Sequence, residues 1–169
     1  MRWLGWTLLA VAALSLIAVI VLLATLVRNA PALLAPPGLA ERLRVYLTRN
    51  VAELSPDARF PELVSPRLPM PPDQALDEVR NAMRALGWQL VDAAATDDAT
   101  DNTARAGSGL SAQVRSPLLG FVDDVRVWLE PTTDGGSWLR ARSRSRLGRG
   151  DLAANAAHLR RLKQALSEP

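Results

Sequence analysis

Residues 121–147 read FVDDVRVWLEPTTDGGSWLRARSRSRL, and this stretch decides the fold. Apolar and polar side chains alternate on both sides of the central PTTDGGS, and a period of two is typical of β-strands. The glycines in the centre indicate a turn, so the stretch is predicted to form a β-hairpin. If the second strand is extended, one of its faces carries four successive arginines and the other carries small or apolar side chains. The arginines are Arg140, Arg142, Arg144 and Arg146.

The apolar positions also suggest how the two strands pair. If Leu129 pairs with Leu139, Asp124 falls opposite Arg144. The two neighbouring arginines of the row then lie on the diagonals, within reach of the same carboxylate. A slip of two residues would keep the same faces and change only the arginine that Asp124 meets.

Two interpretations of Asp123 and Asp124 stay open. A pair of carboxylates can perform acid–base catalysis or hold a divalent metal ion. Adjacent residues of a strand point to opposite faces, however, so these two converge only if a bulge intervenes. We therefore favour a structural interpretation, in which Asp124 balances the arginines and Asp123 accepts hydrogen bonds from Ser145 or from a helix end. Neither a metal site nor a cofactor is predicted.

Two amphipathic helices are predicted around the strands. The first is capped by Asp73 and ends at Gly87; the second is capped by Asp151 and runs to about Leu166. Asn155 lies one turn from apolar positions of the second helix, so its amide is expected to point inward and to need partners. The apolar stripes are Leu76, Val79, Met83 and Leu86 in the first helix, and Leu152, Ala156, Leu159, Leu162 and Leu166 in the second.

Two further strands are predicted at 88–95 and 110–115, joined by a polar loop over 96–109. A helix, three or four strands and a second helix together imply an α+β fold. We expect a small antiparallel sheet of about four strands with both helices on one face and the arginines on the other. A soluble domain is assigned to residues 59–169, after a transmembrane helix over 1–28 and a juxtamembrane linker over 29–58. Within that linker, residues 39–54 carry a weak helical pattern.

The amino-terminal segment has the length of a membrane span. No residue from Trp3 to Val27 is charged, and a bilayer core is crossed by roughly 20 apolar residues. The alternative is a cleavable signal peptide, whose apolar core is normally about 7–15 residues long, so we expect an uncleaved single-pass helix. The orientation stays open. Arginines after the helix place the domain in the cytoplasm by the positive-inside rule, whereas a very short amino tail favours the opposite.

The composition excludes several kinds of site. The chain has no cysteine, which excludes disulfides, thiolate metal sites and a cysteine nucleophile. Its one histidine is His158, so a histidine zinc site or a Ser-His-Asp triad would rest on a single residue. His158 lies one position off the apolar stripe and is predicted at the boundary of the core rather than as a ligand.

Several motifs resemble a known family. FVDDV at 121–125, RSRSR at 142–146, Gly148, Asp151 and NAA at 155–157 are similar to the bacterial and plastid family known as domain of unknown function 1499. LGW at 86–88 and FPEL at 60–63 extend the resemblance to about 60–166. Trp128, Arg140 and His158 depart from the residues usual in the family. The resemblance implies no established activity. Family members often follow a membrane helix or export signal, which favours an inner-membrane protein with its domain on the periplasmic side.

Two functions are consistent with these patterns. The first is a membrane-anchored, non-enzymatic envelope domain that binds a partner protein or an anionic ligand through the arginine face of its sheet. Pairing of the arginines within the fold is the structural alternative, and nucleic acid is disfavoured because few aromatic side chains accompany them. The second function is a hydrolase that uses Asp123 or Asp124 with arginines as clamps. The candidate binding residues are Arg142, Arg144, Arg146, Asp124, Asp123, Asp151 and Asn155.

The turn before the second helix has two interpretations as well. Gly148-Arg149-Gly150-Asp151 precedes a helix start, a place where backbone amides can bind an anion. The carboxylate of Asp151 can occupy that position itself, so a structural cap is the favoured interpretation.

Overall fold

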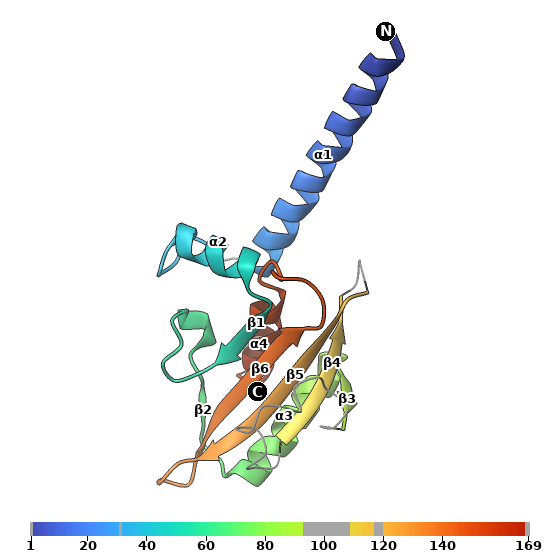
Figure 1. Ribbon diagram of the computed structural model, residues 1–169. Coiled ribbons are helices and arrows are strands. Elements are labelled where there is room, and N and C mark those ends of the chain that lie inside the picture. Colours follow the sequence, from blue (N-terminus) through green and yellow to red (C-terminus); the bar gives the residue numbers. More distant parts are fainter. Residues whose placement is uncertain (1, 31, 93–108, 117–119, 168–169) are drawn as a thin grey trace.

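The hairpin predicted for residues 121–147 forms the centre of the sheet in the computed structural model (Figure 1). Its strands are β5 (Val122–Pro131) and β6 (Ser137–Ser145), which pair antiparallel. Beyond β5 the sheet continues with β4 (Gly109–Arg115) and ends with β3 (Gln89–Val91). The structure describes residues 2–30, 32–92, 109–116 and 120–167. Most of the predicted loop at 96–109 and the end of the predicted strand at 88–95 lie outside these residues.

The sheet has six strands rather than about four. The two additional strands, β1 (Val51–Leu54) and β2 (Arg67–Leu68), both pair with the outer edge of β6. The helix expected over 39–54 is shorter: α2 (Leu39–Thr48) ends at Arg49, whose backbone is extended. Strands this short have little periodicity of their own. They are ordered by pairing with a strand distant in the sequence, which a local pattern does not show.

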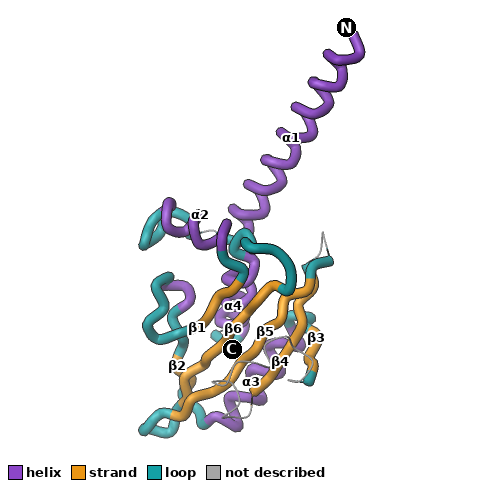
Figure 2. The backbone as a smooth tube through the Cα atoms, viewed as in Figure 1, coloured by secondary structure: helices purple, strands orange, loops and turns teal. Residues whose placement is uncertain are grey.

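Two helices cover one face of the sheet, as predicted (Figure 2). α3 (Pro72–Ala85) packs on β4 and β5, while α4 (Ala154–Ala165) packs on β1 and β6. α3 ends where predicted, because Gly87 adopts the left-handed conformation, with φ of 73°, that stops a helix. Fully buried side chains from both helices and from the inner face of the sheet form the core: Val79, Met83, Val125, Val127, Leu139, Ala141, Leu159 and Leu162.

α1 (Arg2–Asn29) projects from the domain with its apolar side chains exposed (Figure 1). The most apolar 18-residue stretch within residues 5–29 has a mean hydropathy of 2.9, so the helix is long and apolar enough to span a membrane. The last turn of α1 packs against the domain, where Leu26 is buried. The Asn29 amide donates a hydrogen bond of 3.2 Å to the carbonyl of Leu152, and Arg160 donates one of 3.0 Å to the carbonyl of Asn29. The end of the apolar helix is therefore held in place.

The segment predicted as a linker, 29–58, contains α2 and β1 and is largely folded onto the domain. Its central residue is Arg42, whose side chain is fully buried. The Arg42 guanidinium binds Glu62 in the 3₁₀ turn η1 (Pro61–Leu63) through two hydrogen bonds of 2.5 and 3.0 Å. It also donates to the hydroxyl of Tyr46 and to the carbonyls of Ala35 and Pro36, and it lies 4.6 Å from the ring centroid of Phe60. One cation thus joins the segment after α1 to α2 and η1.

The Arg42–Glu62 pair makes the folding stability of the protein depend on pH. Burial alone would raise the pKa of Glu62, but the hydrogen bonds from Arg42 and Tyr46 outweigh it and hold this pKa below the ordinary value of 4.5. A carboxyl whose pKa is depressed by folding stabilises the protein above its ordinary pKa, and the stabilisation is lost as the pH falls through the lower, folded value.

We expect Glu62→Gln to lower the free energy of unfolding by about 2 kcal/mol at pH 7, because Arg42 loses a charged acceptor. The variant should also lose less stability than the native chain when the pH is taken below 4.5. Thermal unfolding of the full chain in detergent micelles, followed by circular dichroism at pH 7 and at lower pH, measures both effects. Equal pH dependence in the two chains would contradict the prediction.

Candidate functional site

The arginine row lies on the sheet face opposite the helices, as predicted. Burial alternates along β6: Leu139, Ala141 and Ser143 are fully buried, whereas Arg144, which points to the opposite face, is exposed. The side chains of Arg140 and Arg142 are 23% and 24% exposed, and each forms an ion pair, with Glu130 at 3.1 Å and with Glu53 at 3.4 Å. The row is therefore a charged surface that is partly balanced by acids of the same sheet.

Leu129 pairs with Leu139, rather than with a residue two positions away, and this register brings Asp124 under the arginines. Asp124 lies opposite Arg144, while the diagonal residue Arg146 binds it in a bidentate pair. Arg146 Nε is 2.7 Å from one carboxylate oxygen of Asp124, and Nη2 is 2.8 Å from the other. Asp124 is 5% exposed, so the arginine compensates a carboxylate that has little contact with water. This geometry supports the structural interpretation of Asp124.

Asp123 points to the opposite face, into the layer between sheet and helices. Its carboxylate is 2.9 Å from Nε2 of His158, a side chain of α4, rather than bonded to Ser145 or a helix end as predicted. The boundary position predicted for His158 is wrong. This residue is buried, 7% exposed, with its ring edge-on to Trp88. α4 lies deeper than a single apolar stripe implies, because the sheet, α3 and α1 all contact it.

The two aspartates do not converge. β5 pairs with β6 in one uninterrupted register from Asp123 to Pro131, and with β4 from Val122 to Trp128, so the bulge that the hydrolase alternative requires is replaced by regular pairing. Within the described residues, no group of three or more His, Asp or Glu side chains could hold a metal ion.

Asp151 caps the last helix, which begins three residues later at Ala154. Its two carboxylate oxygens accept hydrogen bonds from the backbone N–H groups of Ala153, at 2.9 Å, and Asn155, at 3.0 Å. Burial raises the pKa of Asp151, while these amide hydrogen bonds act in the opposite direction. The amides that could bind an external anion are thus used by the cap, as the structural interpretation expects.

Asn155 points inward, as predicted, and is fully buried. Its amide nitrogen donates to the carbonyl of Asn50, at 2.8 Å, and to the hydroxyl of Ser145, at 2.9 Å. Its amide oxygen accepts a hydrogen bond of 2.6 Å from Ser143. Asn155 therefore ties α4 to β6 and to the residue before β1, which gives it a structural role away from the arginine face.

Comparison with known families agrees with the motifs. Residues 42–166 match the family described as protein of unknown function (DUF1499). The chain belongs to the DUF1499 family. The match begins at the buried Arg42 and ends just after α4, so the DUF1499 domain includes most of α2 and all of β1. No curated protein matches the chain.

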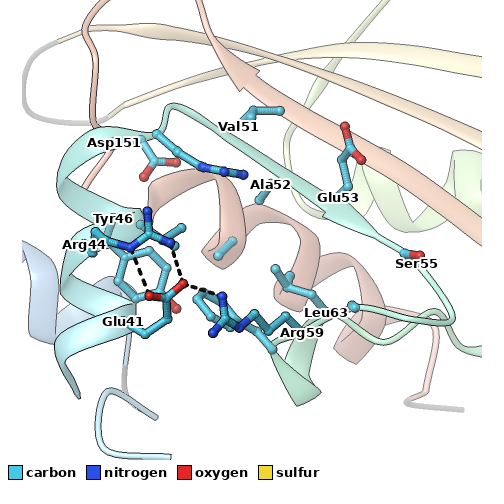
Figure 3. Close-up of a pocket in the computed structure, with 15 residues that line it drawn as sticks. Glu41, Arg44, Tyr46, Val51, Ala52, Glu53, Ser55, Arg59, Leu63 and Asp151 are labelled. Carbon is cyan, nitrogen blue, oxygen red and sulfur yellow. Dashed lines mark hydrogen bonds and ion pairs between the residues drawn. The ribbon is translucent and has the colours of Figure 1, made fainter. Parts of the chain in front are cut away.

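A cavity of about 330 Å³ beside β1 was not predicted from the sequence (Figure 3). It lies between α2, β1 and the segment 58–63 of the DUF1499 domain. Glu41 lies between two arginines at its rim and accepts hydrogen bonds of 2.7 Å from Arg44 and 2.6 Å from Arg59, which lower the pKa of Glu41. The cavity was missed because residues 49–54 were interpreted as helix, and only their pairing with β6 creates this wall.

Removing Arg146 should destabilise the domain far more than removing Arg144. Arg146→Ala leaves the buried carboxylate of Asp124 without its bidentate partner, and we expect a loss of about 3 kcal/mol. Arg144→Ala removes an exposed arginine and should cost less than about 1 kcal/mol. Thermal unfolding of both variants in micelles measures the two losses of stability. Equal losses for Arg146→Ala and Arg144→Ala would contradict the prediction.

Asn155→Ala should lower the free energy of unfolding by about 3 kcal/mol, because it leaves the Asn50 carbonyl and two serine hydroxyls without their partner in the core. Gln164→Ala removes an exposed amide from the same helix and is the matched control, with an expected change within about 0.5 kcal/mol. The measurement is again thermal unfolding of the full chain, and a small loss for Asn155→Ala would show that the amide network is dispensable.

Proposed function

We propose that this DUF1499 protein is a single-pass protein of the inner membrane whose domain is a binding module of the cell envelope. In this proposal the arginine face of the sheet binds a partner protein or an anionic ligand, and the domain performs no catalysis. The membrane assignment is supported by α1, whose exposed apolar surface has no other cover among the described residues. The periplasmic side is the one that the family resemblance implies.

The observation that carries the binding proposal is the charge excess on the sheet face away from the helices. The register places six arginines and three carboxylates of β1, β4, β5 and the β6 row on this face. The arginines are Arg115, Arg126, Arg140, Arg142, Arg144 and Arg146, and the carboxylates are Glu53, Asp124 and Glu130. Ion pairs within the sheet hold several of these arginines in fixed positions, and an excess of positive charge remains over the described part of the face. Such a surface attracts anionic groups.

The positions of the aspartates support binding rather than hydrolysis. Asp124 is held by Arg146, and Asp123 is paired with His158 on the other side of the sheet. A general acid–base pair needs two groups that reach one substrate, and this arrangement separates them.

We expect Arg144→Glu to weaken anion binding about tenfold, a change of about 1.4 kcal/mol. Arg144 is the best position for the test because it is exposed, whereas reversal of Arg146 would leave two acids together. Arg161→Glu, an exposed arginine of α4 away from this face, is the control. The full chain in nanodiscs of zwitterionic lipid is titrated with a fluorescent oligoglutamate, and binding is followed by anisotropy.

Binding should also weaken as the salt concentration rises, because exposed charges are screened. Thermal unfolding of each variant verifies that it is folded. Equal affinities of folded Arg144→Glu and Arg161→Glu for the probe would contradict the proposal.

A further inference from the structure

The cavity beside β1 lies along an edge of the sheet that has unused backbone groups (Figure 3). In an antiparallel pair, every second residue directs its N–H and C=O groups to the neighbouring strand, and the residues between direct them away. Ser145 donates its N–H to the carbonyl of Asn50, directly opposite, and this fixes which residues of β1 face β6. Val51 and Glu53 consequently direct their backbone groups away from β6, on the side of β1 that lines the cavity.

The next position along the same edge is already paired. The N–H of Ser55 donates to the carbonyl of Leu63 at 3.2 Å, and the N–H of Ser65 donates to the carbonyl of Ser55 at 3.0 Å. These bonds form a parallel bridge between Ser55 and Val64. The edge of β1 therefore accepts an extended segment at one end, while no described segment pairs with it at Val51 and Glu53.

Among the charged side chains around the cavity, Arg49 differs from the others in its contacts. The three carboxylates of the cavity have partners: Glu41 binds two arginines, Glu53 pairs with Arg142, and Asp151 caps α4. In contrast, no hydrogen bond or ion pair joins the Arg49 guanidinium to another of the described residues. Apolar side chains supply much of the remaining wall, among them Phe60, Leu63, Ala58 and Ala156.

We propose that this cavity binds an extended acidic peptide segment of another protein by strand addition to β1. The peptide backbone pairs with Val51 and Glu53, which fits a segment of about three residues. Alternate peptide side chains enter the apolar wall, and an acidic side chain between them meets Arg49. This site is at the sheet edge and uses backbone pairing, so it is independent of binding at the arginine face.

The test uses the full chain in nanodiscs of zwitterionic lipid and a fluorescent peptide, acetyl-Glu-Val-Glu-Val-Glu-amide. We expect saturable binding with a Kd of about 1 mM or tighter. Three changes should each weaken it at least tenfold. The peptide with N-methylated amides lacks the backbone donors, the peptide with lysine in place of glutamate reverses the charge, and Arg49→Glu removes the cation of the site. Arg161→Glu carries the same charge change elsewhere and should bind normally.

N-methylation separates this proposal from binding at the arginine face, because a face that attracts only carboxylates would bind both peptides equally. Val51→Pro removes one outward N–H without removing a bond to β6 and should weaken binding if it folds; if it does not fold, the N-methylated peptide and Arg49→Glu still decide. The proposal is overturned if there is no binding at about 1 mM peptide. Equal binding of the N-methylated peptide, or displacement of the peptide by phosphatidylglycerol in the nanodisc, which would indicate a lipid site, overturns it too.

Discussion

Opposite orientation of successive side chains in β6 is the constraint on which the rest of this domain depends. Because odd positions are small or apolar, α4 can pack closely on Ala141 and Ser143. Because the even positions from Arg140 onward are arginines, an apolar layer is disfavoured on the other face of the sheet, and the helices pack on one side. The register with β5 then sends Asp124 to the arginines and Asp123 to the helices. The side-chain alternation of β6 thus explains why the arginines lie on one face of the sheet and the helices on the other.

Buried pairs of polar side chains hold the layers together. Arg146 with Asp124 lies in the sheet, Asp123 with His158 joins the sheet to α4, and Arg42 with Glu62 joins the segment after α1 to the domain. In the two arginine–carboxylate pairs, loss of one partner would leave an uncompensated buried charge, which costs several kcal/mol. Together with the contacts of Asn29, the third pair holds the end of the apolar helix against the domain, so the proposed membrane anchor would present the binding surfaces in a defined orientation.

The two proposed binding surfaces offer a partner different chemical groups. The arginine face offers side-chain charge over a broad area, which suits attraction of an anionic partner. The β1 edge offers backbone donors and acceptors beside an apolar wall, which suits a short extended segment. The ion pair between Glu53 and Arg142 joins the edge strand to the arginine row.

Local pattern in the sequence was enough to predict the hairpin and its two faces, both packing helices, the Asp151 cap and the inward amide of Asn155, because each depends on residues a few positions apart. The alternation of arginines with small or apolar side chains around Arg144 predicts a strand, and the apolar stripe around Leu159 predicts a helix. The choice between the Leu129–Leu139 pairing and a slip of two residues was made only by the structure. Only the tertiary structure decided the roles of residues 49–54 and 67–68, the burial of His158 and the cavity beside β1. These features are created by contacts between distant segments, such as Ala52 with Ser143 or Arg42 with Glu62. Such contacts leave no periodic trace in a four-residue strand or at a single buried charge.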